Sequence, residues 1–272
     1  MSLKLEAHGE EIAGSFLRGR IFLAADRPDR LEVTRLDDGS GAPFPLEPGD
    51  HVTASIRGTK VFTGEIDRVG HGLDPHAGRT STIVAYAEFH RLRESGRQHW
   101  YQVTDAEAAE RVAASLGLSV LAEPTPRVHA RLEVQGDSLA FLRGRARACG
   151  YQLAVRSGRL YFARDLPALG EEMSPRIGHD VVSFSLEERG GPVGTLRGGR
   201  LCAIGDPRWA PLGEVEMKSL DARSTLRYRS LRVLHCLDRR GYRTRVELAE
   251  AGSDYAQWLA CAEEGEPRDA EA

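Results

Sequence analysis

Short apolar runs separated by turn-forming residues constrain the fold of this chain more than any other feature of its sequence. In residues 1–95 apolar and polar positions alternate, as at Val52, Ala54 and Ile56. The runs end at turn-forming clusters such as Pro48-Gly49-Asp50. An alternation of period two places one face of a strand on a core, and Gly, Pro and Asp separate strands at turns. The pattern predicts a small β-barrel or sandwich.

The spacing of the apolar residues changes at about residue 104. Thr104 and Glu107 match the capping box that begins a helix, and apolar residues then recur at four-residue spacing as far as Gly117. A second helix is predicted for residues 138–149, because Gly150 suits the left-handed conformation that ends a helix. The chain therefore changes from strands to helices in its middle.

Strands accompany these two helices. Residues 128–134 alternate in polarity as a half-buried strand does. Residues 151–155 and 160–163 flank Arg156-Ser157-Gly158, a turn sequence typical of a hairpin. We therefore expect an α+β middle domain over residues 96–165.

The remaining chain divides into three parts. Residues 166–180 contain two prolines and two glycines and are predicted to be a linker. Residues 181–250 show strand patterns again and predict a second β-rich domain. Residues 251–272 are predicted to be an acidic, mobile tail, since charged residues dominate their end. The fold class expected is mainly β with a small α+β insertion.

The charge balance argues against nucleic acid as the main partner. Lys and Arg number 37 against 40 Asp and Glu, so the chain lacks the basic excess with which proteins follow a phosphate backbone. The last ten residues contain one arginine and five carboxylates, which are Glu263, Glu264, Glu266, Asp269 and Glu271. Without that tail the body of the chain is nearly neutral.

The sequence indicates neither a targeting signal nor cysteine chemistry. Residues 1–11 are charged throughout and lack the apolar stretch of a signal peptide, and no run of about 18 apolar residues occurs. We therefore expect a soluble protein that is made in the bacterial cytoplasm. Cys149, Cys202, Cys236 and Cys261 are far apart and form no CxxC pair. We expect reduced, mostly buried thiols, and neither a zinc site nor a disulfide framework.

Two motifs of enzyme chemistry are absent from the sequence. It contains no G-x-S-x-G pentapeptide of a serine hydrolase and no G-x-x-x-x-G-K-[ST] loop of a nucleotide site. The nearest approach to the latter, Gly194 to Gly199, is followed by Arg200 and Leu201. Those glycines suit a strand that enters a bulge, or a loop that lines a tube.

Histidines also offer little chemistry. His71 and His76 are five residues apart with no third ligand nearby, which favours a polar hairpin tip over a metal site. His235 precedes Cys236 in an apolar strand, where neighbours face opposite sides. We therefore interpret His235 as a core or interface histidine and not as half of a catalytic pair. The prediction is that the chain is not an enzyme and has no catalytic residues, no cofactor and no metal.

Four segments match motifs of one family in order and in spacing. The first is Pro48-Gly49-Asp50-His51-Val52 with Val61-Phe62-Thr63-Gly64-Glu65-Ile66; the second is Ala85-Tyr86-Ala87-Glu88 with the helix from Thr104 to Leu118; the third is Phe141-Leu142, Arg147-Ala148, Gly150-Tyr151, Gly158 and Leu160-Tyr161-Phe162; the fourth is Gly205-Asp206-Pro207, Pro211 to Gly213, Val233 to Leu237 and Gly241-Tyr242-Arg243-Thr244. Over residues 48–248 the chain thereby resembles the late-control D proteins of phage tails and the hub part of VgrG proteins. The positions that carry this signature are Gly49, Asp50, Phe62, Gly64, Gly150, Tyr151, Asp206, Pro207, Gly213, His235, Tyr242 and Thr244.

The resemblance implies a structural baseplate hub. In that family three chains form a ring, and each chain supplies two related β-barrel domains, so that six barrels match a sixfold tail tube to a threefold spike. The implied partners are two further copies of the chain, a tail tube or tube-initiator protein above and a spike below. A baseplate wedge or a LysM-type adaptor is a further implied partner, and nucleic acid passes only as transiting cargo. The assembly is a virion tail, a pyocin-like particle or an extracellular injection particle.

The sequence departs from the VgrG pattern after Leu248, where about 25 residues remain and no oligonucleotide-binding-type fold or needle follows. The spike is therefore expected to be a separate polypeptide. The segment from Leu196 to Trp209 is richer in Gly and Arg than a plain barrel strand.

Two other functions compete with the hub. One is a cell-wall hydrolase of the tail tip that uses Asp206, His235 or Asp238. The other is a carbohydrate-binding module built on Trp100, Tyr101, Trp209 and Tyr242, although such aromatics more often belong to cores and subunit contacts.

Overall fold

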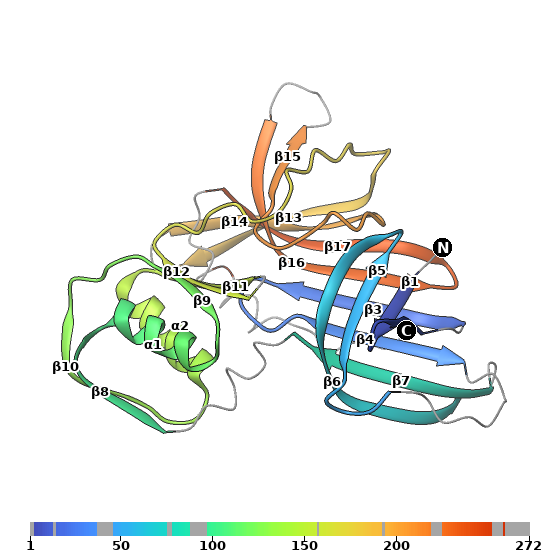
Figure 1. The fold of residues 1–272 in the computed structure, drawn as a ribbon. Coiled ribbons are helices and arrows are strands. Elements are labelled where there is room, and N and C mark those ends of the chain that lie inside the picture. Colours follow the sequence, from blue (N-terminus) through green and yellow to red (C-terminus); the bar gives the residue numbers. More distant parts are fainter. Residues whose placement is uncertain are drawn as a thin grey trace.

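The computed structural model describes residues 3–12, 15–36, 46–74, 78–87, 97–156, 158–191, 194–218, 225–251 and 258. Most of these residues belong to strands, and two helices lie side by side in the middle of the sequence (Figure 1). The predicted class, mainly β with a small α+β insertion, is confirmed.

The elements fall into three regions along the chain. The first region contains β1 (Leu3–Ala7), β2 (Glu10–Glu11), β3 (Phe16–Ala24), β4 (Arg30–Leu36), β5 (His51–Ile56), β6 (Thr59–Asp74) and β7 (Gly78–Tyr86). The middle region contains β8 (Gln98–Thr104), α1 (Asp105–Ser115), β9 (Ser119–Ala122), β10 (Val128–Val134), α2 (Ser138–Cys149), β11 (Gln152–Arg156) and β12 (Arg159–Ala163). The last region contains β13 (Val181–Gly191), β14 (Gly194–Ile204), β15 (Glu214–Lys218), β16 (Thr225–Asp238) and β17 (Gly241–Glu250).

The local signals in the middle region are confirmed. The Thr104 hydroxyl accepts from the Glu107 amide and the Glu107 carboxylate accepts from the Thr104 amide, which satisfies two amides at the start of α1. Gly150 caps α2 at φ 68°, in the left-handed region. β11 and β12 pair antiparallel up to Arg156 and Arg159, so the predicted hairpin is present. Its turn residue Ser157 lies outside the described residues.

One antiparallel sheet joins the first and last regions. Within the described residues it has twelve strands in the order β13-β14-β17-β16-β3-β4-β7-β6-β5-β1-β2, with β15 paired to β16. The two regions meet where β16 pairs with β3, for example Val233 opposite Leu23 and Leu237 opposite Gly19. Leu23, Val233 and Leu237 face inward and belong to one hydrophobic core, which also contains Ile21, Val246 and Leu248. The sequence patterns did not predict this pairing.

Residues 166–180 form no strand but run along β15. The amide of Met173 donates to the carbonyl of Glu214, and the amide of Glu216 donates to the carbonyl of Met173. The amide of Leu169 donates in the same way to the carbonyl of Leu212. This segment is therefore held against the last region by backbone hydrogen bonds.

Buried ion pairs fasten the β3–β4 turn to the other two regions. Arg232 of β16, only 4% exposed, places Nη2 2.8 Å from Oδ2 of Asp26. Arg156 of β11 places Nη1 2.6 Å from Oδ2 of Asp29. Removing one partner of a buried pair leaves an uncompensated charge, so these contacts fix how the regions meet.

The cysteines correct one expectation. Cys149, Cys202 and Cys236 are free, but each is half-buried and not buried as predicted. Cys202 and Cys236 alternate with core residues on their strands and so lie on the outward side of the sheet. Cys261 lies outside the described residues.

Candidate functional site

The signature residues of the last region converge around one buried histidine. His235 of β16 is fully buried. Its Nε2 lies 3.1 Å from the carbonyl oxygen of Trp209, and its Nδ1 lies 2.8 Å from the Tyr242 hydroxyl and 3.3 Å from Oγ1 of Thr244. A carbonyl only accepts, so Nε2 carries the hydrogen and Nδ1 accepts. The prediction of a satisfied core histidine is confirmed.

Burial decides the charge of this imidazole. Desolvation lowers the pKa of His235 to about 4. The hydrogen bond to the Trp209 carbonyl acts in the opposite direction but is the smaller effect. The ring is therefore neutral at pH 7, and it links β16, β17 and the loop before β15.

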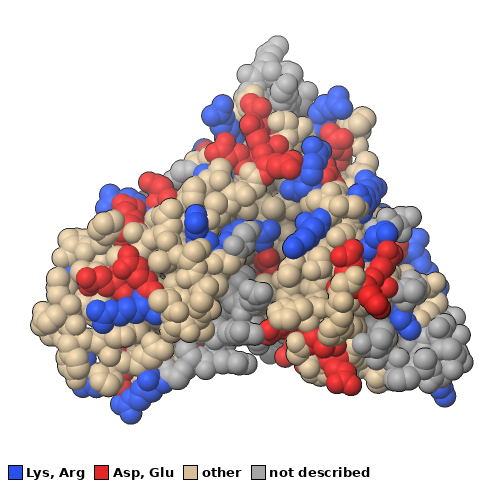
Figure 2. Space-filling model, viewed as in Figure 1, with Lys and Arg blue, Asp and Glu red and all other residues tan. Residues whose placement is uncertain are grey.

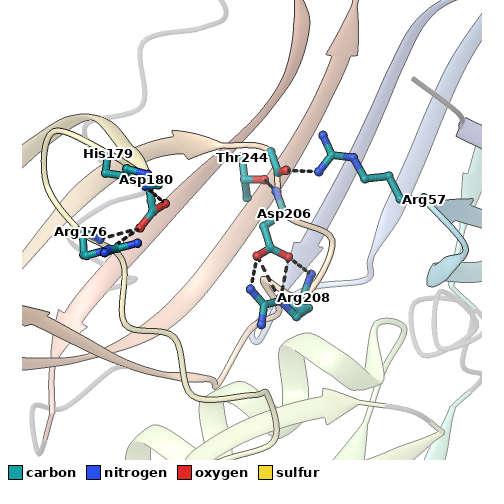
Figure 3. Close-up of polar contacts among 8 residues, drawn as sticks. Arg57, Arg176, His179, Asp180, Asp206, Arg208 and Thr244 are labelled. Carbon is teal, nitrogen blue, oxygen red and sulfur yellow. Dashed lines mark hydrogen bonds and ion pairs between the residues drawn. The ribbon is translucent and has the colours of Figure 1, made fainter.

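That loop contains the Gly205-Asp206-Pro207 signature. Burial alone would raise the pKa of the Asp206 carboxyl, but Arg208 outweighs it and the pKa is lowered. Arg208 donates to Asp206 from Nη2 at 2.6 Å and from Nε at 3.1 Å (Figure 3). The amide of Asp206 donates to Thr244, so the loop is tied to β17.

Gly205 permits this packing, because a Cβ added there would lie 2.1 Å from Cγ of Tyr242. The phenol ring thus lies directly on the backbone of the loop. Gly213 likewise permits close packing of the backbone in this site. Its amide donates to Oγ of the buried Ser230, and a Cβ there would lie 2.9 Å from the carbonyl of Glu171.

A residue that the motifs did not single out connects this cluster to the first region. Arg57 lies between β5 and β6 with φ 52°, and its guanidinium is 5.5 Å from the centre of the Tyr242 ring. Its Nη1 lies 3.4 Å from the carbonyl oxygen of Gly205, as drawn in Figure 3. The tip of the β5–β6 hairpin is thus docked on the signature loop. No local pattern marks Arg57, since its role depends on a contact 148 residues away.

A second carboxylate lies beside this cluster, at the start of β13. Asp180 is 2.6 Å from Nδ1 of His179 and accepts from the amide of Arg176, and the first of these contacts is the largest cause of its lowered pKa. Its carbonyl accepts from the amide of Ile204 at the end of β14. Asp180 and Asp206 therefore flank the same strand end, each paired with an arginine.

The signature residues of the β5–β6 hairpin form its base. Gly49 turns the chain at φ 96°, and Asp50 accepts from the amide of Glu47 through Oδ2 at 2.8 Å. Phe62 is in the core, and Gly64 lies so close to β7 that a Cβ would meet the Tyr86 carbonyl at 2.1 Å. These positions shape a hairpin and not a binding pocket.

The remaining signature pair, Gly150 and Tyr151, is at the end of α2. The Tyr151 hydroxyl donates to the Pro124 carbonyl at 2.9 Å, and its ring packs on Phe162. The structure therefore places the signature in three groups, of which Arg57 joins the hairpin to the His235 cluster.

A buried polar cluster in the middle region was missed by the sequence patterns. Asp105, fully buried at the start of α1, is 2.5 Å from Nε of Arg145, 3.0 Å from Nε2 of His129 and 3.1 Å from Sγ of Cys149. Burial alone would raise the pKa of Asp105, but these hydrogen bonds hold it at about 2. The sequence shows only that Asp105 follows a capping residue.

The arrangement of the candidate residues gives little support to the two alternative functions, a cell-wall hydrolase and a carbohydrate-binding module. His235 is fully buried, and Asp238 at the end of β16 accepts from the amide of Arg240. Of the four candidate sugar-binding aromatics, Trp209 and Tyr242 are buried and Trp100 packs on Phe141, while Tyr101 is 61% exposed. They do not form a shared platform.

Neither a metal centre nor a membrane-spanning helix is present among the residues that the structure describes. His71 Nδ1 lies 3.0 Å from Oγ of Ser81, and His76 lies outside the described residues. Among the described residues no cluster of three or more His, Cys, Asp or Glu is arranged to hold a metal. Their helices are also too short and too polar to cross a bilayer.

The fold is that of phage tail proteins. The chain superposes with a TM-score of 0.70 on the 43 kDa tail protein of prophage MuSo2 from Shewanella oneidensis, at 13% identity over 91% of this chain and 98% of that one. The tail protein from Neisseria meningitidis MC58 gives 0.67 at 13% identity, over 92% and 96%. The E. coli c3393 protein, described as a type VI secretion component with structural similarity to T4 tail proteins gp27 and gp5, gives 0.70 at 10% identity, over 92% and 77%. No family model and no curated protein matches the chain.

Proposed function

We propose that this chain is the structural hub of a phage tail or contractile injection system. Three copies form a ring that joins a sixfold tail tube to a threefold spike and encloses the delivery channel. The observation that carries the proposal is the agreement in fold with tail proteins over more than nine-tenths of the chain. The likeness to a secretion component described as similar to gp27 and gp5 supports the hub in particular.

In this proposal residues 1–95 and 181–250 are the two related barrel domains, and residues 96–165 are the insertion that residues 166–180 connect. The late-control D and VgrG hub proteins are the family that the chain resembles. The spike is a separate polypeptide below the ring, and the tube or its initiator binds above. The protein acts by holding these components together and not by catalysis.

The free edge of the sheet favours assembly with further copies. Among the described strands β13 lies at one end of the sheet, and a strand edge without a partner is a template for association with another chain. Val182, Leu186 and Ile204 beside this edge are 58%, 59% and 55% exposed. Acidic and basic side chains are interspersed on the face in Figure 2, which therefore offers no extended basic track for nucleic acid.

The first test is the mass of the purified full-length protein in solution, alone and mixed with the spike protein encoded beside it. We expect a trimer, or a complex of three chains with three spike chains, by chromatography with light scattering. A monomer that does not bind the spike protein would contradict the proposed hub function, although the fold assignment would still stand.

A separate test addresses His235. Because its folded-state pKa of about 4 lies below the ordinary value near 6.5, the unfolded chain binds more protons between these values. The neutral His235 therefore contributes its full stabilisation above pH 6.5. As the pH falls from 6.5 to 4, the free energy of unfolding decreases by roughly 3 kcal/mol. Urea unfolding at several pH values should show this slope in the wild type and lose it in His235→Gln. An identical slope in the variant would show that His235 does not titrate as described.

A further inference from the structure

The outward face of the sheet carries a group of arginines that have no acidic partner among the residues that the structure describes. On β17 the side chains of Tyr242, Thr244 and Val246 point into the core, and the alternating residues point outward. Four outward arginines near this position form what we call the arginine face: Arg18, Arg20, Arg243 and Arg245. Among the described residues none of the four takes part in a hydrogen bond or ion pair with a carboxylate.

The strand register brings these arginines together. Cys236 of β16 lies opposite Arg243 of β17 on one side and opposite Arg20 of β3 on the other. The three residues form one row across three adjacent strands, so the two arginines are about 10 Å apart. Arg245 also lies close enough to Cys236 to act on the pKa of its thiol.

The carboxylates on the same face form ion pairs with other arginines. Glu32 lies opposite Arg20 in the strand register, but its carboxylate is 2.7 Å from Arg30, and Glu247 is 3.5 Å from Arg232. Asp238 accepts from the amide of Arg240. The arginine face therefore retains an excess of positive charge that a partner of opposite charge would neutralise.

The end of the chain is anchored on this same outward face. Trp258 is fully buried in a small cluster with Leu196, Leu231 and Ala249, separate from the main core. Ala249 is on the side of β17 that also carries Arg243 and Arg245, because odd-numbered residues of this strand face outward without a break in register. Gly198 makes room for the indole, since a Cβ there would lie 2.5 Å from it.

The sequence beyond Trp258 supplies the missing charge. Residues 263–271 contain five carboxylates and one arginine. Glu263 is five positions beyond Trp258 along the chain, a stretch that spans up to about 17 Å when it is extended. Arg245 is four residues from Ala249 along β17, or about 13 Å. The acidic segment can therefore reach the arginine face.

We propose that residues 263–271 dock on the arginine face of their own chain and cover it electrostatically. The segment is tethered by Trp258, so the high effective concentration favours it over a free acidic peptide. An external polyanion has to displace it before it contacts these arginines. The proposal goes beyond the hub function and holds for a monomer as for a ring.

The native cysteines allow a direct test on the full-length protein. Cys261 precedes the acidic segment, and Cys202 and Cys236 lie on the face. A short bis-maleimide should link Cys261 to Cys202 or Cys236 within one chain, as read by peptide mass spectrometry. The yield should fall about tenfold in the variant E263Q/E264Q/E266Q/D269N/E271Q and in R243Q/R245Q, because several weak exposed ion pairs add up. In 1 M salt, where the Debye length is about 3 Å, the wild type should behave like the variants.

A matched control is R111Q/R147Q, which removes two exposed arginines from α1 and α2 and should leave the yield unchanged. A yield that is insensitive to salt and to the acidic segment would overturn the proposal, as would links formed only between copies. A labelled oligodeoxynucleotide provides a second readout. Binding should be about tenfold tighter in the variant without tail carboxylates, since the competitor is gone. Equal binding by both proteins would show that the acidic segment does not cover the arginine face and would contradict the proposal.

Discussion

Replacing Asp105 with alanine should destabilise the middle region by about 3–5 kcal/mol, because the change leaves Arg145 and the largely buried His129 without their shared carboxylate. Urea unfolding and amide hydrogen exchange in α2 would measure the loss. The control is Arg97→Ala, which removes an exposed ion pair with Glu133 and should have a far smaller effect. An Asp105→Ala protein as stable as the wild type would show that this cluster contributes nothing.

The same carboxylate gives the region a defined acid sensitivity. The pKa of Asp105 is about 2 in the folded protein, below its ordinary value of 3.8. The stabilisation is therefore present above pH 4 and is lost as the pH falls from about 4 to about 2. Comparison of wild type with Asp105→Asn over this range would isolate the contribution of one residue.

Lysine at both Val182 and Leu186 should prevent assembly of the proposed trimeric ring. Each apolar side chain contributes about 1.5 kcal/mol or more when a partner buries it, so the two together weaken each interface roughly 100-fold. Lysine on an edge strand also opposes pairing with another strand. Light scattering over a range of concentrations would detect the shift from trimer to monomer.

The matched control changes two other exposed apolar residues, Leu73 and Val128, which are 77% and 57% exposed and are remote from β13 in the sequence. Lysine at these positions should leave the oligomer intact. If the β13 variant remains a trimer, the ring is assembled through another surface and the edge strand is free in the particle.

The sequence predicted those elements whose signals are local. The capping box at Thr104, the left-handed stop at Gly150 and the alternation in residues 128–134 depend on neighbours a few positions away. All three appear in the structure, because short-range hydrogen bonds and side-chain periodicity depend on neighbouring residues and not on the rest of the fold.

The features that the sequence did not predict depend on distant contacts. Glycine has low strand propensity, yet Gly198 and Gly199 lie within β14 because neighbouring carbonyls approach too closely for a side chain. The docking of Arg57 on Tyr242 and the meeting of Asp105 with Arg145 join residues far apart in sequence. Such contacts produce no periodic pattern in the sequence. The motifs therefore predicted residues of the candidate site, but not the contacts between them.

The pairing of β16 with β3 sets the order in which the molecule becomes complete. Asp26 and Arg232, which meet at this junction, are separated by 206 residues. During synthesis one edge of β3 therefore has no partner until β16 has been made, and contacts of such long range are slow to form. A nascent chain that stops before β16 exposes Ile21 and Leu23 beside an open strand edge, which is the condition for aggregation and for chaperone binding. Only a chain that includes β16 can present the paired sheet to a partner, so copies truncated before β16 are excluded from assembly.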